Sequence, residues 1–366
     1  MACAGFALLG VVGLAIDLGR IFTIKTETQA YTDAAALAAA IELDGTASGI
    51  TAAQAAVTSA NNTWNFNTTA IPAPTVEFAQ SLAGPWSASP GSAAGYTFAR
   101  VAASVSAPLA FMPVVMPAES RKFTQTIASR SVAAQIDIDT FPKGLAPYTA
   151  VSTNTMGPDF GLTAGAHYSM QWPQFNGTRQ GCDAVTPEKC FNADPCEGDS
   201  DASLWAVASN WASANNGYWG FQSNQEIKLS VLDGLQTQPI SVGTNISPIL
   251  SNGNKAAQAD VLDLRVQGDA DNASNVVSTY LASSAHNGRR LMVMPIVNPA
   301  SPTSSTVSGF GEFLLLSNGS SSNYYKHETN GNDPFCAIYV GPYVLGGTGP
   351  GGATNGTGAY RVKLVE

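Results

Sequence analysis

Histidine, the side chain used most often as a general acid, base or metal ligand, is rare in this sequence. The three histidines, His167, His286 and His327, are too scattered for a metalloprotease helix or a catalytic triad. The chain has no Gly-x-Ser-x-Gly motif, no Walker loop and no Gly-x-Gly-x-x-Gly after a strand. We therefore predict that the protein is not an enzyme and uses no cofactor.

Two acidic segments could in principle offer oxygen ligands to Ca²⁺. They run from Asp194 to Asp201 and from Asp263 to Asp271. Neither segment has the spacing of an EF-hand loop, and solvated loop charge is the simpler interpretation of both. We predict no metal site.

Five cysteines occur, and Cys3 lies in an apolar stretch where we expect a packed thiol. The other four fall in the body of the chain, at Cys182, Cys190, Cys196 and Cys336. They are too widely spaced for a zinc site, and if the chain is exported, their even number favours two disulfides. Three pairings are open. We expect Cys182 with Cys190 as a local loop, which leaves Cys196 with Cys336.

The composition restricts the class of protein. A chain of 366 residues is long enough for two or three domains. Only 12% of the residues are charged, the net charge is −9, and no basic run could neutralise a phosphate backbone. These values exclude a nucleic-acid-binding protein, and the 45% hydrophobic content excludes a disordered chain.

The N-terminus predicts one long helix. Residues 1–16 carry no charge, and no proline occurs before Pro72, so we expect a helix from about residue 2 to 43. The uncharged stretch is slightly shorter than the roughly 20 residues that cross a bilayer. It runs on into Asp17 without the pattern of a cleaved signal, so we expect it to remain part of the protein.

A near-heptad apolar pattern follows this stretch and predicts a packing face on the helix. It is interrupted by Asp17 and Thr28 and comprises Leu14, Ile21, Ile24, Tyr31, Ala35 and Ala38. The second half of the helix could lie on its own domain. The uncharged half, with Leu8 and Val12, needs lipid or other copies of itself to cover it. Asp17 and Arg20 are three residues apart, so we expect them to pair within a chain or between subunits.

Two parts of the sequence resemble a known family. The run from Gly13 to Arg20, with Lys25–Gln29 and Thr32–Ala40, is similar to the N-terminal segment of TadE/TadG-like proteins of tight-adherence (Flp) pilus systems. Residues 287–297, 309–313 and 336–341 resemble the C-terminal part of large TadG-related proteins more loosely. The resemblance implies an exported protein that is associated with the inner membrane or the pilus. Gly5 stands where type IV pilins have a glutamate.

The pattern of the remaining residues predicts mainly β structure. Short alternating runs at 75–78, 96–101 and 123–128 predict antiparallel strands, and helical patterns occur near 202–214, 224–234 and 271–284. We therefore expect an α+β protein with three parts. These are an N-terminal assembly helix at 1–43, a small pilin-like unit at 44–140 and a larger, mainly β domain at 141–366.

Three functions remain open at this point. The first is a pilin-like subunit that polymerises into an extracellular helical filament through its N-terminal helix and sits in the inner membrane before assembly. The second is a membrane-anchored minor pilin or pilus-assembly factor. The third, an enzyme or carbohydrate-binding domain on a stalk, is disfavoured because no catalytic constellation occurs.

Overall fold

The computed structural model describes residues 2–60, 62–65, 68–116, 118–151, 156–169, 215–219, 223–246, 250–252, 259–301, 304–316, 336–346, 351–353 and 356–366. The chain divides into two compact units, which we describe separately. Unit 1 consists of Met1–Ile136 with Val362–Glu366, and unit 2 of Asp137–Arg361. The N-terminal helix and the residues that follow it therefore share one unit, and the last residues of the chain return to it.

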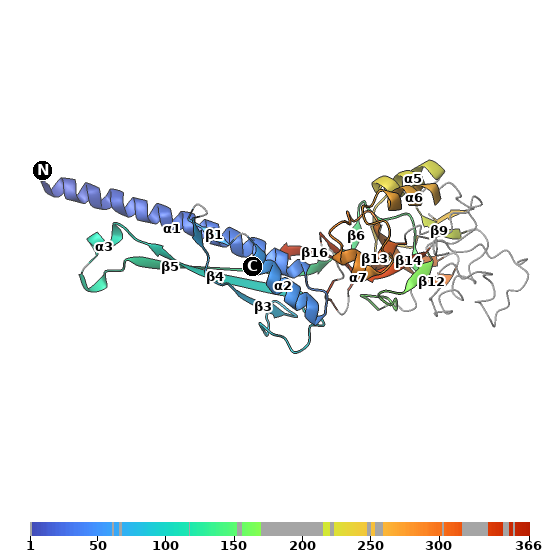
Figure 1. Ribbon diagram of the computed structural model, residues 1–366, viewed down its shortest axis with the longest axis horizontal. Coiled ribbons are helices and arrows are strands. Elements are labelled where there is room, and N and C mark those ends of the chain that lie inside the picture. The colour runs from blue at the N-terminus through green and yellow to red at the C-terminus, as the bar shows by residue number, and fades with distance from the viewer. Residues whose placement is uncertain are drawn as a thin grey trace, which may run out of the picture. The chain divides into compact units, whose positions relative to one another are not determined.

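The expected long helix is present as α1, Ala2–Ile41 (Figure 1). Gly45, with a positive φ of 78°, lies in the turn after it. Thr46 then caps a second helix, α2, Ala47–Ser59, by accepting a hydrogen bond from the Gly49 N–H at 3.2 Å. The helix α2 was not expected from the sequence.

Unit 1 also contains an antiparallel sheet. It is built from β3 (Thr75–Ala79), β4 (Phe98–Pro108), β5 (Thr124–Asp137) and the end of β16 (Ala359–Leu364). β4 lies between β3 and β5, and β16 lies on the other side of β5. A short ladder joins β1 (Thr63–Trp64) to β2 (Thr69–Ala70). The three predicted strands are confirmed, although β4 and β5 extend well beyond the expected ranges.

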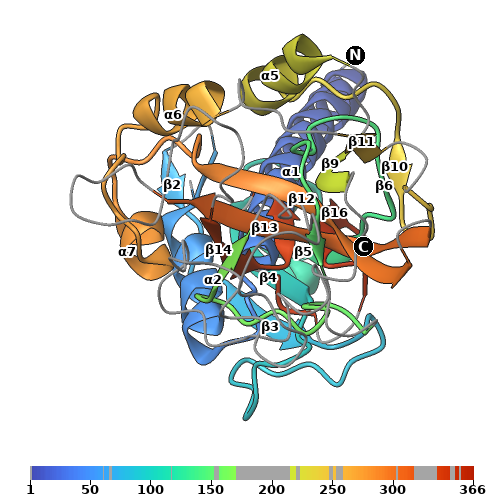
Figure 2. The ribbon, with the colours of Figure 1, turned by 90° about the vertical axis from the view of Figure 1, so that its right-hand side faces the viewer.

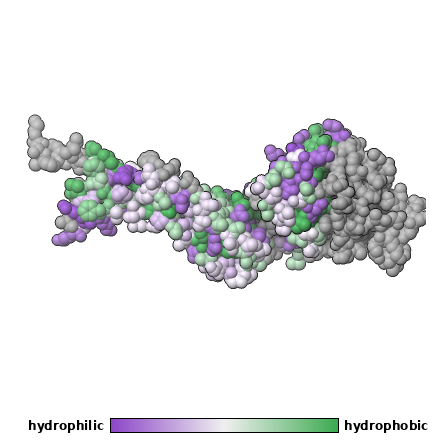
Figure 3. Space-filling model, in the orientation of Figure 1, coloured by the Kyte–Doolittle hydropathy of each residue, from purple (hydrophilic) through white to green (hydrophobic). Residues whose placement is uncertain are grey.

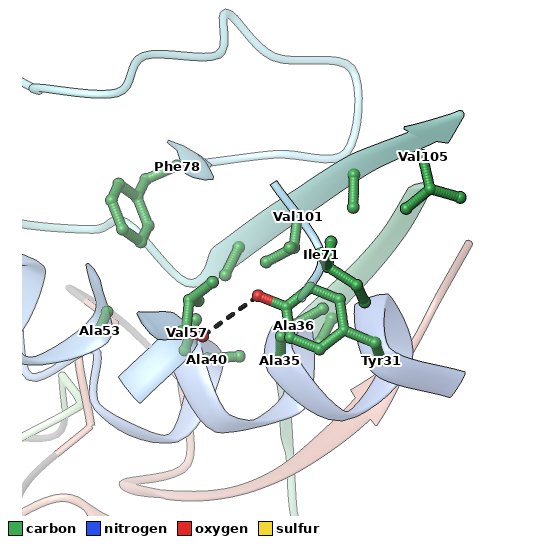
Figure 4. Close-up of a cluster of buried hydrophobic side chains, with 14 of the residues drawn as sticks. Tyr31, Ala35, Ala36, Ala40, Ala53, Val57, Ile71, Phe78, Val101 and Val105 are labelled. Atoms are coloured by element: carbon green, nitrogen blue, oxygen red, sulfur yellow. Dashed lines mark hydrogen bonds between the residues drawn. The ribbon is translucent and has the colours of Figure 1, made fainter. Parts of the chain in front are cut away.

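The core of unit 1 lies between α1, α2 and this sheet. β4 alternates buried and exposed residues, and its buried side chains include Val101, Ala103 and Val105. They belong to the same buried cluster as Ile24, Tyr31 and the alanines of α1 (Figure 4). The Tyr31 hydroxyl donates to the Val57 carbonyl of α2 at 3.2 Å. The small alanine side chains allow the helix to lie close to the sheet.

Polar side chains add specific ties between α1 and β5. Lys25 Nζ donates to the Ala128 carbonyl at 2.5 Å, and Gln29 Nε2 donates to Ser131 Oγ at 2.9 Å. Gln135 Nε2 donates to the carbonyls of Ala40 and Leu43, at 2.9 and 2.7 Å, where α1 ends. Gln135 thus satisfies two carbonyls at a helix end that have no partner within the helix.

Unit 2 is built around a mixed sheet in the order β7-β12-β13-β14-β8 (Figure 2). Its strands are Ala150–Val151, Leu291–Ser301, Ser304–Leu315, Cys336–Gly341 and His167–Ser169. β12 and β13 form a long antiparallel hairpin, and β7 pairs with β12 in parallel. Shorter ladders occur in the described residues of this unit as well. One pairs β6 (Thr140–Phe141) with β10 (Ile240–Ser241), and another pairs β9 (Asn215–Trp219) with β11 (Leu250–Asn252). β15 (Tyr343–Leu345) pairs with the start of β16.

Within the described residues of unit 2, three helices accompany the sheet. They are α5 (Asn224–Asp233), α6 (Ala259–Gln267) and α7 (Val277–Ala282). α5 confirms the helix expected at 224–234, whereas α6 was not expected. The helix expected at 271–284 is wrong for residues 271–276, since only Val277–Ala282 are helical. The pattern near 202–214 lies outside the described residues.

A buried polar network explains why the chain before α7 is a loop. Asp269 accepts hydrogen bonds from the Tyr280 hydroxyl at 2.6 Å and from the backbone N–H of Asp271, Asn287 and Arg290. Burial opposes its ionisation, but these four donors outweigh burial and hold the pKa of Asp269 below its ordinary value. The expectation of solvated charge is therefore wrong for Asp269, which is buried and organises the loop.

Candidate assembly interface

The two halves of α1 differ in what covers them. In the second half, one face is buried within unit 1 and includes Ile24, Thr28, Tyr31 and Ala35, while Ala38 is half-buried. This part of the predicted packing face therefore lies on its own domain. Thr28, which interrupts the apolar pattern, fits there because its hydroxyl donates to the Ile24 carbonyl at 2.7 Å.

The first half of α1 exposes apolar side chains. Val11 is 69% exposed and Phe22 is 70% exposed, and the other exposed apolar residues here are Val12, Leu14, Ile16 and Leu18. Leu14, which the apolar pattern places on the packing face, is 37% exposed and is not covered by its own unit. The buried positions are Gly13 and Asp17 instead, because a loop of the same unit packs there. The side chain of Leu8 lies outside the described residues.

The exposed residues include a continuous stripe. Val11, Ala15, Leu18 and Phe22 are separated by four, three and four residues and therefore share one face of the helix. We call these four residues the outer stripe. At about 100° per residue, this face lies opposite the side that carries Gly13, Asp17 and Ile24.

The loop that packs on α1 is the tip of the β4–β5 hairpin. We use "tip" for residues 109–116 and 118–123, which contain the single helical turn α3 (Met112–Val115) and the 3₁₀ turn Ala118–Ser120. Asp17 is only 1% exposed, and its carboxylate accepts the backbone N–H of Ala110, Phe111 and Met112 at 3.0, 2.8 and 2.6 Å. Asp17 thereby attaches the tip to the helix.

The electrostatics of Asp17 follow from these contacts. Burial raises the pKa of this carboxyl, but the N–H groups of Met112, Ala110 and Phe111 lower it, as does the positive charge of Arg20. The net effect holds the pKa of Asp17 below its ordinary value. The side chain is therefore an ionised, buried hydrogen-bond acceptor at neutral pH.

Asp17 and Arg20 form no ion pair within the described residues of the chain, and their pairing between subunits stays a prediction. In the part of the chain that the structure describes, the ion pairs join Arg100 to Glu77 and Arg130 to Glu366. Both oxygens of the Asp17 carboxylate accept hydrogen bonds from the tip, and Arg20 is half-buried. This role of Asp17 could not be predicted from the sequence, because backbone N–H donors some 93 residues away leave no pattern of side-chain types.

Gly13 explains how the tip approaches the helix so closely. A Cβ atom at this position would lie 2.7 Å from both Cβ and Cγ of Phe111. Such a contact is shorter than van der Waals packing permits. Gly13 and Asp17, one helical turn apart, thus form a receptor for the tip.

The remaining predicted site residues fall elsewhere. Ile21 is half-buried beside the core of unit 1. Cys182, Cys190 and Cys196 lie outside the described residues, and Cys336 begins β14 with its side chain also outside them. The disulfides and their pairing remain predictions. Over the ranges that the structure covers, no cluster of histidine, cysteine and acidic residues could hold a metal ion.

Comparison with known proteins bears on the same helix. Residues 1–42 match the family described as "Putative Flp pilus-assembly TadE/G-like". The resemblance of the N-terminal segment to this family is therefore confirmed, and the match covers α1. No curated protein and no solved structure matches the chain.

The TadE/G-like segment links the chain to the Flp pilus system and to a cell-surface or membrane-associated location. Within the described residues, we find no helix with the length and apolar character of a membrane span. The segment ends at residue 42, one residue beyond α1. The family match thus coincides with the element that carries the outer stripe and the receptor for the tip.

Proposed function

We propose that this protein is a structural subunit of an extracellular filament of the Flp pilus system and that it polymerises through the first half of α1. The observation that carries the proposal is the outer stripe, which faces away from the core of unit 1. Each square ångström of apolar surface left in water costs about 25 cal/mol, so a continuous stripe favours association. The natural partner is the same stripe on another copy.

The spacing of the stripe suits packing between helices. Apolar residues at steps of four and three form the ridges that interlock when two helices cross at a shallow angle. Gly19 lies on the same exposed side, and a Cβ built there would meet no atom within 4 Å. A neighbouring helix could therefore approach closely at this point. Before assembly, the uncharged residues 1–16 would hold the subunit at the inner membrane.

Electron microscopy of sheared surface material tests the proposal. We expect fibres from the wild type and a loss of fibres from Val11→Glu and from Phe22→Glu, because each places an unpaired charge between helices. Leu82→Glu, at an exposed apolar residue of unit 1 that is not on α1, is the matched control and should assemble normally. Circular dichroism of the variants should show an intact fold. Normal fibres from both α1 variants would contradict the proposal.

The alternative is a membrane-anchored minor pilin or assembly factor that uses the same helix. It is favoured by the short extent of the family match, which covers only the N-terminal segment. Immunogold labelling of the fibres distinguishes the two functions. Labelling along the whole fibre indicates a main subunit, whereas fibres that form without this protein indicate an assembly factor.

A further inference from the structure

The tip of the β4–β5 hairpin exposes large apolar side chains. Phe111 is 43% exposed, Val114 is 74% exposed and Phe123 is 67% exposed. They come from both arms of the tip, and none of them belongs to the buried core of unit 1. Single exposed apolar residues are ordinary on protein surfaces, but three in one short loop indicate a contact surface.

Basic side chains accompany these apolar ones. Arg121 and Lys122 are exposed and directly precede Phe123, and Arg20 lies on α1 one turn after the Asp17 that binds the tip. None of the three forms an ion pair within the described residues. The one acidic residue of the tip is Glu119. With Arg20, Arg121 and Lys122 against the carboxylates of Asp17 and Glu119, this apolar surface carries one net positive charge, whereas the whole chain carries −9.

The geometry fixes this surface relative to the helix. Asp17 and Gly13 hold the tip beside residues 13–17, which is where the uncharged part of α1 ends. The apolar side chains of the tip therefore lie level with those of the first half of α1. Figure 3 shows hydrophobic and hydrophilic residues close together at this end of unit 1.

We propose that the tip binds an anionic lipid surface. Phe111, Val114 and Phe123 enter the boundary between headgroups and acyl chains, and Arg20, Arg121 and Lys122 bind lipid phosphates. Aromatic and apolar side chains next to basic ones are what this boundary accommodates. Lipid is favoured because the tip lies beside the end of the uncharged segment of α1 and because its three neighbouring cations gain phosphate partners at an anionic bilayer. The proposal does not depend on whether α1 polymerises.

Photocrosslinking identifies the partner directly. A benzophenone amino acid replaces Val114 in the full chain, which is then mixed with vesicles of phosphatidylcholine and phosphatidylglycerol and irradiated. We expect a lipid adduct, detected by mass spectrometry, and none from the same group at Leu82. A crosslink to a second copy of the chain, or no lipid adduct, would overturn the proposal.

Vesicle flotation measures the contribution of each part. Arg121→Gln with Lys122→Gln should weaken binding to the anionic vesicles about 25-fold, at about fivefold for each basic residue, and leave binding to phosphatidylcholine alone unchanged. Phe111→Ser with Val114→Ser and Phe123→Ser should weaken binding to both kinds of vesicle, while Leu82→Ser should not. Unchanged binding by both tip variants would overturn the proposal. Fibre formation is scored separately, so failure of the filament proposal remains distinguishable.

Discussion

At the scale of single residues, Asp17 and Gly13 determine which face of α1 packs on its own unit. A carboxylate in a largely apolar helix is costly to bury, and here three backbone N–H groups of the tip compensate for that cost. The glycine one turn earlier leaves room for Phe111. Together they direct one face of the helix to its own unit and leave the opposite face free for a partner.

Asp17→Asn should loosen the tip at neutral pH. Asparagine is uncharged and has one carbonyl oxygen in place of two carboxylate oxygens, and hydrogen bonds to a charged group contribute about 1.5–3 kcal/mol. We expect faster hydrogen exchange of the amides of residues 110–112 in the variant. Exchange of β3, which the tip does not touch, should be unchanged.

The same contact predicts a dependence on pH with a definite sign. Because the folded pKa of Asp17 is lowered, its stabilisation is fully present above the ordinary value of 3.8 and is lost as the pH falls through the lower, folded value. The difference between wild type and Asp17→Asn should therefore shrink in strong acid. A difference that does not change with pH would contradict a role for the carboxylate charge.

Gly13→Ala and Gly19→Ala form a matched pair. Alanine favours a helix over glycine by about 1 kcal/mol, so Gly19→Ala, where a Cβ meets no atom within 4 Å, should stabilise unit 1. Gly13→Ala would place its Cβ against Phe111 and should displace the tip, offsetting that gain. Denaturant unfolding with hydrogen exchange of the tip checks both. Equal effects of the two substitutions would show that the approach of Phe111 is not tight.

At the scale of elements, unit 1 depends on the junction between the end of α1 and β5. The last carbonyls of a helix lack partners within it. Here the buried amide of Gln135 donates to the carbonyl of Ala40, in the last turn of α1, and to that of Leu43, just after the helix. The strand therefore determines where the helix can end. This tie is independent of the apolar contacts between α1 and β4.

Gln135→Ala should destabilise unit 1 by about 1–3 kcal/mol, because it leaves the buried carbonyls of Ala40 and Leu43 without this donor. Gln125→Ala, at an exposed position of the same strand, is the control and should change stability by less than about 0.5 kcal/mol. Chemical denaturation of each variant gives the comparison. Equal changes in the free energy of unfolding for the two variants would argue that Gln135 contributes only side-chain packing and that its two hydrogen bonds add no stability.

At the scale of the whole molecule, the two units differ in the features that they contain. The family match and the candidate interface lie in unit 1, whereas most of the residues belong to unit 2. Unit 2 also contains a buried carboxyl, Glu312, on β13 opposite Val293 and Gly341. Burial raises the pKa of Glu312 to about 8.

The buried carboxyl makes the stability of unit 2 depend on pH. A raised pKa means that the folded state holds a proton that the unfolded state releases, so stability should fall as the pH rises from the ordinary 4.5 to about 8. Glu312→Gln should remove this dependence and stabilise the unit at pH 8 by about 4 kcal/mol. Urea unfolding at pH 5 and pH 8 measures it. A steeper loss of stability with pH in the variant than in the wild type would contradict the assignment.

The long helix, the α+β class and the relation to pilus systems could all be predicted from the amino-acid sequence. These features rest on local information: an uncharged run without proline, alternating strands between turn residues, and a family motif within the first 42 residues. The apolar period also identified Ile24, Tyr31 and Ala35 as a packing face, because side chains four and three residues apart share one side of a helix.

Which face of the first half of α1 is covered follows from the tertiary structure and could not be predicted from the sequence. Leu14 is exposed, while Gly13 and Asp17 are buried, because a hairpin tip distant in the sequence binds there through its backbone. Backbone donors are the same for nearly every residue type, so a sequence pattern does not reveal them. Hydrogen bonds between a side chain and distant backbone groups hold the tip, the end of α1 at Gln135 and the loop around Asp269. These bonds exist only once the chain has folded.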